Sequence, residues 1–280
     1  MCLRSRGTSR SICSGPKKAA MTSAARFPGW ASEMGTFFYD LHVHSCLSPC
    51  AQDDMTPHNI AGMAKLNGLH IVALTDHNSA KNCPAFEDAC AEYGVVAVGG
   101  MELTTAEDIH LVCLFESTEQ AQSFERDLQS MRTLVKNKPA LMGNQNIVDA
   151  QDSLIGTEEY LLPIATSLSL RDAYAFADSH GALLYPAHVD RPSNGIIAVL
   201  GTYPDEPPFA AAEFRDEKSL ADCRKRYPAL KKVRPLFCSD AHCLLDLNEA
   251  EHSLRLDCPQ DAPPEEIRRA LFRCLREEKK

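Results

Sequence analysis

Histidine and acidic side chains recur in this sequence where apolar runs end. The first pair is His42 and His44, at the end of an apolar run that starts at Thr36. Because residues i and i+2 of a strand point to the same face, two imidazoles at this spacing can bind one cation. An H-x-H pair alone is a weak signal, but five later fragments each add donors after an apolar run. They are Thr75-Asp76-His77, Gly100-Met101-Glu102, Asp108-Ile109-His110, Tyr185-Pro186-Ala187-His188 and Ser239-Asp240-Ala241-His242.

This donor set predicts a site for more than one metal ion. Its members are His42, His44, His77, Glu102, His110, His188, Asp240 and His242. They are too many for one tetrahedral ion, so two or three divalent ions are expected. Imidazole suits zinc, manganese and iron, carboxylates add harder oxygen ligands, and the two oxygens of Glu102 can bridge two ions. Metals about 3.5–4 Å apart clamp the attacking and leaving oxygens of a phosphoryl group, which favours phosphate ester hydrolysis with Glu102 and Asp240 as catalytic residues.

Three other polar residues near these fragments have both a functional and a structural interpretation. Arg191 could bind a substrate phosphate through its planar fork, or it could form a surface ion pair with Asp190 or cap the C-terminus of a helix. Asp40 and Asp76 each lie close to a candidate ligand. Either carboxylate could orient an imidazole, or it could instead bond to the backbone at the end of a strand.

Alternating apolar runs and helical patterns predict the elements that position these donors. Strands are expected at 36–41, 69–74, 95–98, 109–115, 182–185, 210–214, 233–238 and 253–256, and helices at 57–67, 84–93, 118–135, 158–162, 170–179, 194–200, 219–226 and 263–276. This alternation indicates a parallel sheet, and about seven strand–helix units suit a barrel. Chemistry in such a fold gathers at the carboxyl ends of the strands, and only His110, near the start of its strand, does not fit.

Composition limits the class of protein. With 44% hydrophobic and 24% charged residues, the 280-residue chain resembles an ordinary globular protein. The net charge of -9 argues against non-specific duplex binding, but a bound metal could still attract a small anionic substrate. Twelve cysteines without a C-x-x-C motif indicate reduced core thiols in a cytoplasmic protein. No apolar run approaches the ~18 residues of a membrane span.

The chain divides into a basic N-terminal stretch and one domain. Residues 1–34 contain six basic residues and resemble a transit peptide in composition. We interpret them as a disordered tail, or as an over-extended start with initiation at Met21 or Met34. Residues 35–280 are expected to form a single domain. Its least regular part is an excursion at 136–166, which could lie over the site.

The motifs resemble the PHP (polymerase and histidinol phosphatase) superfamily of metal-dependent phosphoesterases. The resemblance spans roughly residues 37–245 and includes all the fragments in order. It implies an α/β fold, a distorted barrel of seven strands and helices in a single domain. It also implies that His42, His44, Glu102 and Asp240 bind one metal, that Glu102, His110 and His188 bind a second, and that His77 and His242 contribute to a third.

The loop after the H-x-H pair departs from the family pattern. Relatives often place a histidine or aspartate there as a further ligand of the third metal, whereas this loop offers Cys50 and Asp53. A thiolate is a good zinc ligand, so both residues are candidate third-site ligands. The alternative for Cys50 is a loop thiol packed against the barrel rim.

The predicted function is that of a cytoplasmic hydrolase of phosphoric esters. A metal-bridging hydroxide would attack a small phosphomonoester or a nucleotide-like phosphodiester, while the metals and Arg191 neutralise the developing charge. One alternative is an exonuclease on short single-stranded nucleic acid, which needs a basic or aromatic track near the site. Another is a non-catalytic metal-binding protein that docks a partner. Nucleic acid is not the favoured partner, no membrane partner is expected, and the oligomeric state stays open.

Overall fold

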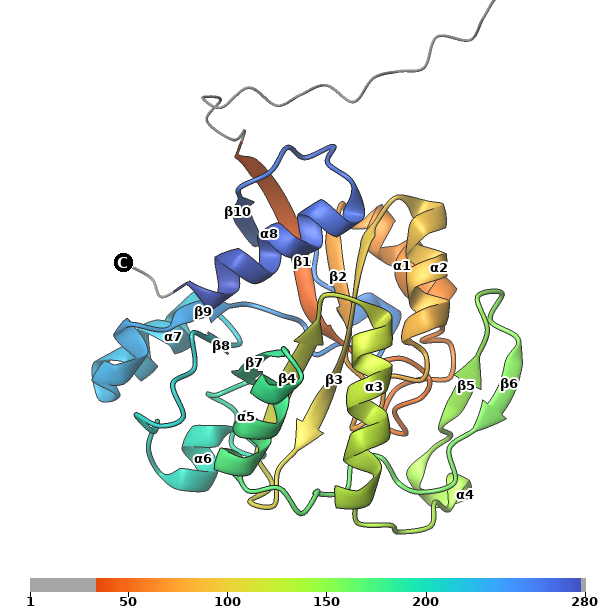
Figure 1. Ribbon diagram of the computed structural model, residues 1–280, viewed down its shortest axis with the longest axis horizontal. Coiled ribbons are helices and arrows are strands. Elements are labelled where there is room, and N and C mark those ends of the chain that lie inside the picture. Colours follow the sequence, from red (N-terminus) through yellow and green to blue (C-terminus); the bar gives the residue numbers. More distant parts are fainter. Residues whose placement is uncertain (1–33, 278–280) are drawn as a thin grey trace, which may run out of the picture. The chain divides into compact units, whose positions relative to one another are not determined.

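A curled mixed sheet with helices on both faces forms the centre of the protein (Figure 1). The computed structural model describes residues 34–277, so the prediction for 1–34 lies outside these residues except at Met34. The strands are β1 (Gly35–Val43), β2 (Ile71–Leu74), β3 (Val96–Thr104), β4 (His110–Phe115), β5 (Asn146–Val148), β6 (Leu154–Thr157), β7 (Leu183–Pro186), β8 (Ala211–Glu213), β9 (Arg234–Leu236) and β10 (Ser253–Leu256). The α-helices are α1 (Pro57–Leu66), α2 (Cys83–Tyr93), α3 (Thr118–Leu128), α4 (Pro139–Met142), α5 (Leu170–Ser179), α6 (Ile196–Leu200), α7 (Glu217–Arg226) and α8 (Pro264–Arg276).

The sheet has the strand order β10-β1-β2-β3-β4-β7. β1, β2 and β3 are parallel, whereas β4 is antiparallel to both β3 and β7, and β10 is antiparallel to β1. The parallel pair β8–β9 lies beside β7, and Ala241, soon after β9, forms a parallel bridge with Val43 of β1. The sheet therefore curls back toward its first strand, which confirms the distorted α/β barrel. The expectation of a parallel sheet is wrong for β4 and β10.

Alternating side chains of the strands feed two apolar clusters, one on each face of the sheet. Ile71 and Ala73 of β2 join the cluster that contains α8, and Val72 and Leu74 join the one that contains α1, α2 and α3. Burial on both faces explains why β2 is apolar throughout. Leu271 of α8 is fully buried, a contribution of roughly 1.5–3 kcal/mol. No helix among the described residues has the length and apolar character to cross a membrane.

Two predicted helices in and around the excursion differ from the structure. α3 ends at Leu128 rather than near residue 135, because the following turn directs Arg132 inward to the carbonyl oxygen of Tyr160. The helix predicted at 158–162 is absent: Leu162 donates its N–H to a glutamine side chain and its carbonyl accepts from an asparagine side chain. These tertiary hydrogen bonds replace the ones a helix would form. The excursion instead contains α4 and the β5–β6 hairpin.

Candidate metal centre

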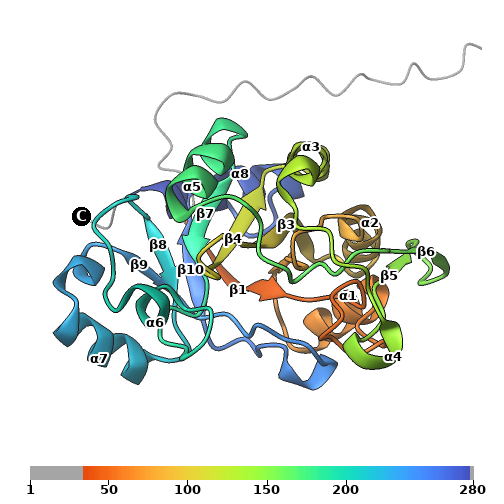
Figure 2. The same ribbon diagram turned by 90° about the horizontal axis from the view of Figure 1, so that it is seen from below.

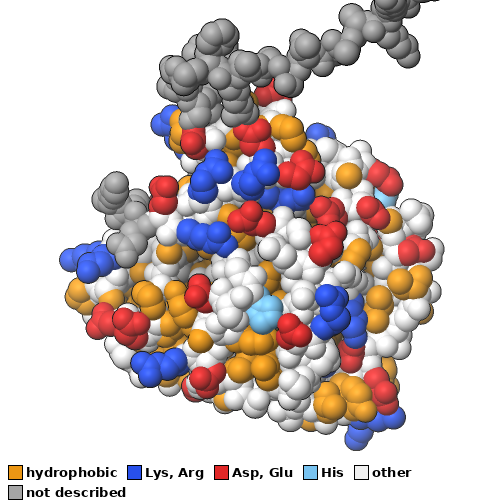
Figure 3. Space-filling model, in the orientation of Figure 1, with side chains coloured by type: hydrophobic (Ala, Val, Ile, Leu, Met, Phe, Trp, Pro, Cys, Tyr) orange, Lys and Arg blue, Asp and Glu red, His pale blue; other side chains and the backbone are white. Residues whose placement is uncertain are grey.

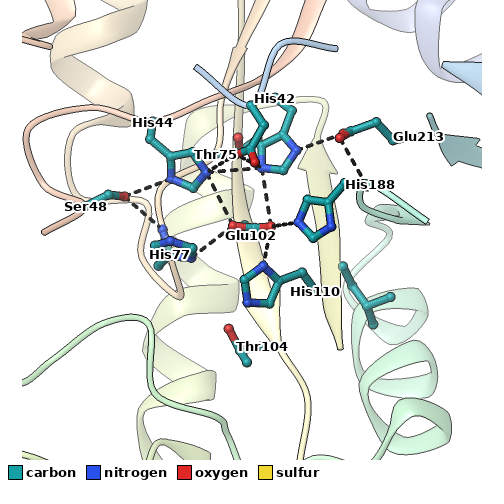
Figure 4. Close-up of polar contacts among 12 residues, drawn as sticks. His42, His44, Ser48, Thr75, His77, Glu102, Thr104, His110, His188 and Glu213 are labelled. Carbon is teal, nitrogen blue, oxygen red and sulfur yellow. Dashed lines mark hydrogen bonds and ion pairs between the residues drawn. The ribbon is translucent and has the colours of Figure 1, made fainter. Parts of the chain in front are cut away.

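The predicted donors gather at one edge of the sheet, where β1, β2, β3 and β7 end (Figure 4). His42 belongs to β1 and Glu102 to β3, while His77 and His188 follow β2 and β7. The loop after β9 adds Asp240 and His242. The side chains that Figure 4 labels point toward one another, with the carboxylate of Glu102 at their centre.

His110 reaches this edge although it is the first residue of β4. Since β4 is antiparallel to β3 and β7, its start lies beside their ends: Thr104 pairs with His110, and Leu111 pairs with Pro186. Parallel strands would have placed His110 at the far edge. The reversal of β4 therefore explains the one donor that did not fit the predicted parallel sheet.

The first group of donors is His42, His44, Glu102 and Asp240. The Nε2 atoms of the two histidines lie 3.1 Å apart. Oδ1 of Asp240 lies 3.4 Å from Nε2 of His42 and 3.1 Å from Nε2 of His44. The oxygens of Glu102 lie 3.5 Å and 3.3 Å from the same two nitrogens. Two imidazole nitrogens and two carboxylates thus face one small volume.

Partners on the far side of the two rings determine where their protons lie. Nδ1 of His42 lies 2.8 Å from Oε2 of buried Glu213, which can only accept, so Nδ1 carries the proton. Nδ1 of His44 lies 3.0 Å from the hydroxyl of Ser48, which donates its own proton to Asp76 at 2.7 Å. Nδ1 of His44 therefore donates as well. When the rings are neutral, both Nε2 lone pairs face each other and the two carboxylates.

This cluster of acceptor atoms fits a divalent metal ion. Buried acceptors so close together repel one another unless a cation lies between them. Oδ1 of Asp240 is buried and has no hydrogen-bond partner. Nitrogen and oxygen donors in this combination are ligands that zinc, manganese and iron share.

A second group of donors surrounds the same glutamate. Nδ1 of His77 lies 2.9 Å from Oε2 of Glu102, and Nδ1 of His110 lies 2.7 Å from Oε1. Nε2 of His188 lies 3.2 Å from Oε1. Both oxygens of Glu102 thus have imidazole neighbours in both groups, which is the geometry of a carboxylate that bridges two ions.

A third group contains only histidines: His44, His77 and His242. The ring of His44 stacks on that of His242 with the centroids 4.3 Å apart, and its centroid lies 4.6 Å from that of His77. Nδ1 of His242 lies 2.7 Å from the carbonyl oxygen of Asp240, so Nδ1 donates and Nε2 is the available donor to a metal. This group lacks a carboxylate of its own and is the least negative of the three.

The electrostatic environment differs across the cluster. Burial lowers the pKa of His44, but the carboxylates of Asp240 and Glu102 beside its Nε2 favour the protonated ring, outweigh the burial and raise the pKa to about 9. Burial alone would raise the pKa of Glu102, but His110 and the other histidines hold it well below its usual range. Burial lowers the pKa of both His77 and His242 to about 4. Positive charge is therefore favoured on the carboxylate side of the cluster.

Backbone strain occurs at two of the donors. His188 has φ of 26° and Asp240 has φ of 51°, values that residues other than glycine rarely adopt. The backbone N–H of His188 donates to Oε1 of Glu213 at 3.1 Å, and Glu213 also accepts from His42. One buried carboxylate thus holds donors from β1 and from the loop after β7. Strain maintained by the surrounding structure is common at functional sites.

The other three candidate residues, Arg191, Asp53 and Cys50, lie at the edge of the donor cluster or outside it. Arg191 pairs with Asp240 rather than with Asp190: its Nη1 lies 2.6 Å from Oδ2 of Asp240, and its side chain is 49% exposed. Asp53 is exposed and accepts from the side chain of Asn144 at 2.9 Å. Cys50 is an exposed residue, but its thiol is partly buried. This burial, followed by the charge of Glu102, raises the pKa of the thiol to about 12. Among the described residues, neither Cys50 nor Asp53 joins a group of donors.

Asp40 and Asp76 differ in their partners: one orients an imidazole and the other binds the backbone. Asp76 reaches His44 through Ser48, so it orients a candidate ligand through one hydroxyl. Asp40 accepts from the backbone N–H groups of Ser239 and Asn248, which is the structural alternative.

Sequence reasoning missed Glu213 and Thr104. Glu213 ends β8, a strand that was predicted, and the pattern of a polar residue closing an apolar run could have identified it. Thr104 lies two residues after Glu102, so both side chains point to the same face of β3. Its Oγ1 is buried and has no hydrogen-bond partner, and Figure 4 places it below His110.

The edge that carries the donors is bordered on two sides (Figure 2). α4 and the β5–β6 hairpin lie on one side, and α6 and α7 lie on the other. The backbone N–H of Asn146 donates to the carbonyl oxygen of Cys46 at 2.8 Å, and a side chain at Gly143 would collide with Pro49. The excursion therefore packs on the loop after the H-x-H pair.

Comparison with known proteins identifies the family. The PHP domain model matches residues 40–148, which include His42, His44, His77, Glu102 and His110. The match confirms, over residues 40–148, the resemblance to the PHP superfamily that the sequence motifs indicated. Members of this superfamily are hydrolases that act on phosphoester bonds, and they use several divalent metal ions. The other candidate donors, from His188 onward, lie beyond the matched segment.

Three relatives illustrate the range of similar proteins. A 5'-3' exoribonuclease of Haemophilus influenzae is 28% identical over 106 residues, which are 37% of this chain and 35% of the exoribonuclease. The lesion-specific endonuclease EndoQ of Pyrococcus furiosus has a TM-score of 0.57 at 20% identity, covering 85% of this chain and 56% of the endonuclease. A Bifidobacterium adolescentis protein assigned as a metal-dependent phosphoesterase has a TM-score of 0.52 at 18% identity, covering 86% and 98%. The chain thus spans about a third to a half of the two nucleases.

Proposed function

We propose that this protein is a metal-dependent phosphoesterase. The observation that supports it is the convergence of the predicted histidine, glutamate and aspartate donors into overlapping groups at one strand edge. Structural zinc sites are closed, four-coordinate and usually rich in cysteine. This cluster has no cysteine and more donors than one ion uses, which suits a multinuclear hydrolytic site.

The proposed ligands follow from the three groups. His42, His44, Glu102 and Asp240 would hold one ion, Glu102, His110 and His188 would hold a second, and His44, His77 and His242 could hold a third. Glu102 would be shared by the first two ions, while Glu213 fixes the ring of His42 and Ser48 fixes the ring of His44. Zinc, manganese or iron would suit these ligands. When bound, such ions activate water and neutralise phosphate charge.

Arg191 is the proposed phosphate-binding residue. Its guanidinium already lies at the metal centre through Asp240, and half of the side chain is open to solvent. A guanidinium has a second edge for a phosphate when one edge binds a carboxylate. Arg191 would therefore orient a substrate phosphate and stabilise charge that develops on its oxygens.

The substrate class we favour is a small phosphomonoester or a nucleotide-like phosphodiester. On the face shown in Figure 3, acidic and basic side chains are interspersed, and the chain as a whole carries a net charge of -9, which argues against a basic footprint for nucleic acid. The second candidate is an exonuclease on short single-stranded nucleic acid. The relatives named as an exoribonuclease and an endonuclease support this second candidate.

A cytosolic location also agrees with the cysteines. The ten cysteines within residues 34–277 are free thiols, and most of them are buried. Thiols in this state persist in reducing compartments.

The test is a panel of phosphomonoesters and phosphodiesters with protein loaded with zinc, manganese or iron, together with metal analysis. Turnover is expected with metal and is lost after exhaustive chelation. Glu102→Gln should lose turnover as well, because an amide cannot bridge two cations with equal oxygens. Glu217→Gln, an exposed acid on α7, is the matched control and should keep it. Full turnover by metal-free protein would rule the proposal out.

A further inference from the structure

A cavity lies beside the candidate metal centre, between the loop after His188 and helices α6 and α7. Its volume is about 420 Å³. Arg191 belongs to both places, since its side chain lines the cavity while its Nη1 lies 2.6 Å from Asp240. If a substrate phosphate binds Arg191 at the candidate metal centre, the rest of the substrate can extend into this cavity.

Cationic side chains line this cavity although the chain as a whole is acidic. They are Arg191, Arg215, Lys218 and Arg226. Lys218 and Arg226 are exposed. Within residues 34–277 their charged ends form no hydrogen bond or ion pair. Arg215 uses only its Nε, which lies 3.3 Å from Asp216. Most of the N–H groups of these cations are thus available to a ligand.

The acidic residues of the same lining already have partners. Asp190 accepts the backbone N–H of Arg215 at 3.3 Å. Asp216 caps α7 and accepts a backbone N–H of its first turn at 2.7 Å. Asp222 lies 3.0 Å from the ammonium group of Lys225, a residue that does not line the cavity. Asp222 also interacts with the charges of Lys218 and Arg226, but it forms no hydrogen bond or ion pair with either, so the N–H groups of both side chains stay available to a ligand.

We propose that this cavity binds a second phosphate group of the substrate, in addition to the phosphate at the metal centre. The inference rests on the proposed phosphoesterase function. Arginine presents a planar fork that matches phosphate, and lysine adds a point charge. Tyr227, which also lines the cavity, offers an aromatic face to a sugar or a base. A nucleoside bisphosphate and a short oligonucleotide share this chemistry.

The test compares a nucleoside monophosphate, the corresponding bisphosphate and a dinucleotide with a terminal phosphate, all with the metal-loaded full-length protein. The double variant Lys218→Ala, Arg226→Ala removes the two free cations. Lys225→Ala is the matched control, because Lys225 is exposed on the same helix but does not line the cavity. All three side chains are exposed, so the variants should fold.

The ratio of kcat/KM for the two-phosphate substrate to that for the monophosphate should fall roughly tenfold in the double variant, as for the loss of charge-assisted hydrogen bonds. It should stay unchanged in Lys225→Ala. A fall with the bisphosphate assigns a small substrate, and a fall with the dinucleotide assigns an oligonucleotide. An unchanged ratio in the double variant overturns the proposal. If no compound is hydrolysed, the phosphoesterase proposal fails. The cavity proposal is then tested separately by calorimetric binding of the bisphosphate. Equal affinity in the wild type and the double variant overturns the cavity proposal.

Discussion

Glu213 is the residue whose replacement best tests how the metal centre is organised. Each of its two oxygens accepts one hydrogen bond, from Nδ1 of His42 at 2.8 Å and from the backbone N–H of His188 at 3.1 Å. Glu213→Gln keeps the shape of the side chain but leaves a single acceptor oxygen for two donors. The amide nitrogen must then face one of these donors.

Both orientations of the new amide have a cost that can be measured. If its oxygen faces His188, the ring of His42 must move its proton to Nε2, which removes a metal ligand. If its oxygen faces His42, the buried N–H of His188 loses its acceptor, which costs about 1–3 kcal/mol. The negative charge that raises the basicity of His42 is lost in either case. Replacing such a partner lowers metal affinity by roughly 10–100-fold, or about 1.4–2.7 kcal/mol.

The assay is competition for zinc between the protein and a chromophoric chelator, read beside circular dichroism and Tm. Glu213→Gln is expected to weaken zinc binding by that factor while the far-ultraviolet spectrum stays native. Glu217→Gln, an exposed acid on α7, should match the wild type. Native folding with wild-type zinc affinity in Glu213→Gln would refute the claim that this carboxylate sets the tautomer of His42.

Asp240→Asn is expected to lower metal content and turnover together, because it removes an anionic ligand beside His42 and His44; metal analysis of folded protein that matches the wild type would contradict this. Lowering the pH below about 6 should release metal and reduce turnover in parallel, since bound imidazoles must be neutral, and a pH titration of metal content checks it. Thr104→Val removes a buried hydroxyl without a partner, so Tm should hold or rise. Its kcat should fall if the hydroxyl faces the reacting groups, and an unchanged kcat would exclude that role.

Most of the donor set could be predicted because one rule places it. A polar residue that closes an apolar run must lie at a sheet edge, and parallel strands bring such edges together. His42, His77 and His188 follow this rule directly. His110 lies at the same edge for a different reason, since β4 is antiparallel to β3 and β7 and its first residue lies beside their ends. Strand direction depends on tertiary packing, which the local sequence of β4 does not encode.

The groups that orient the donors were harder to predict. Glu213 lies 171 residues from His42 in sequence, so no spacing connects the two. Ser48 looked like an ordinary loop residue, although its hydroxyl links Asp76 to His44. The surroundings of Asp53 were hidden for a similar reason: it accepts from Asn144 in the excursion, an interaction between segments that no local pattern reveals. Periodicity predicts on which face of a helix or strand a side chain lies, but it does not predict which residue from another segment that side chain contacts.

Amide side chains connect the excursion to the loops that carry the candidate donors. Asn82 donates to the carbonyl oxygen of Asn146 and to the hydroxyl of Ser45, and its own oxygen accepts the N–H of Val148. It thus links the hairpin of the excursion to the loop after the H-x-H pair. Asn78, next to a candidate ligand, donates to the carbonyl oxygen of Leu162 at 2.7 Å. Because these bonds are buried, displacing the excursion would leave several polar groups unpaired, at about 1–3 kcal/mol each. Hydrogen bonds therefore connect the excursion to both donor loops, and we expect a substrate to approach from the side of α6 and α7, which these bonds leave open.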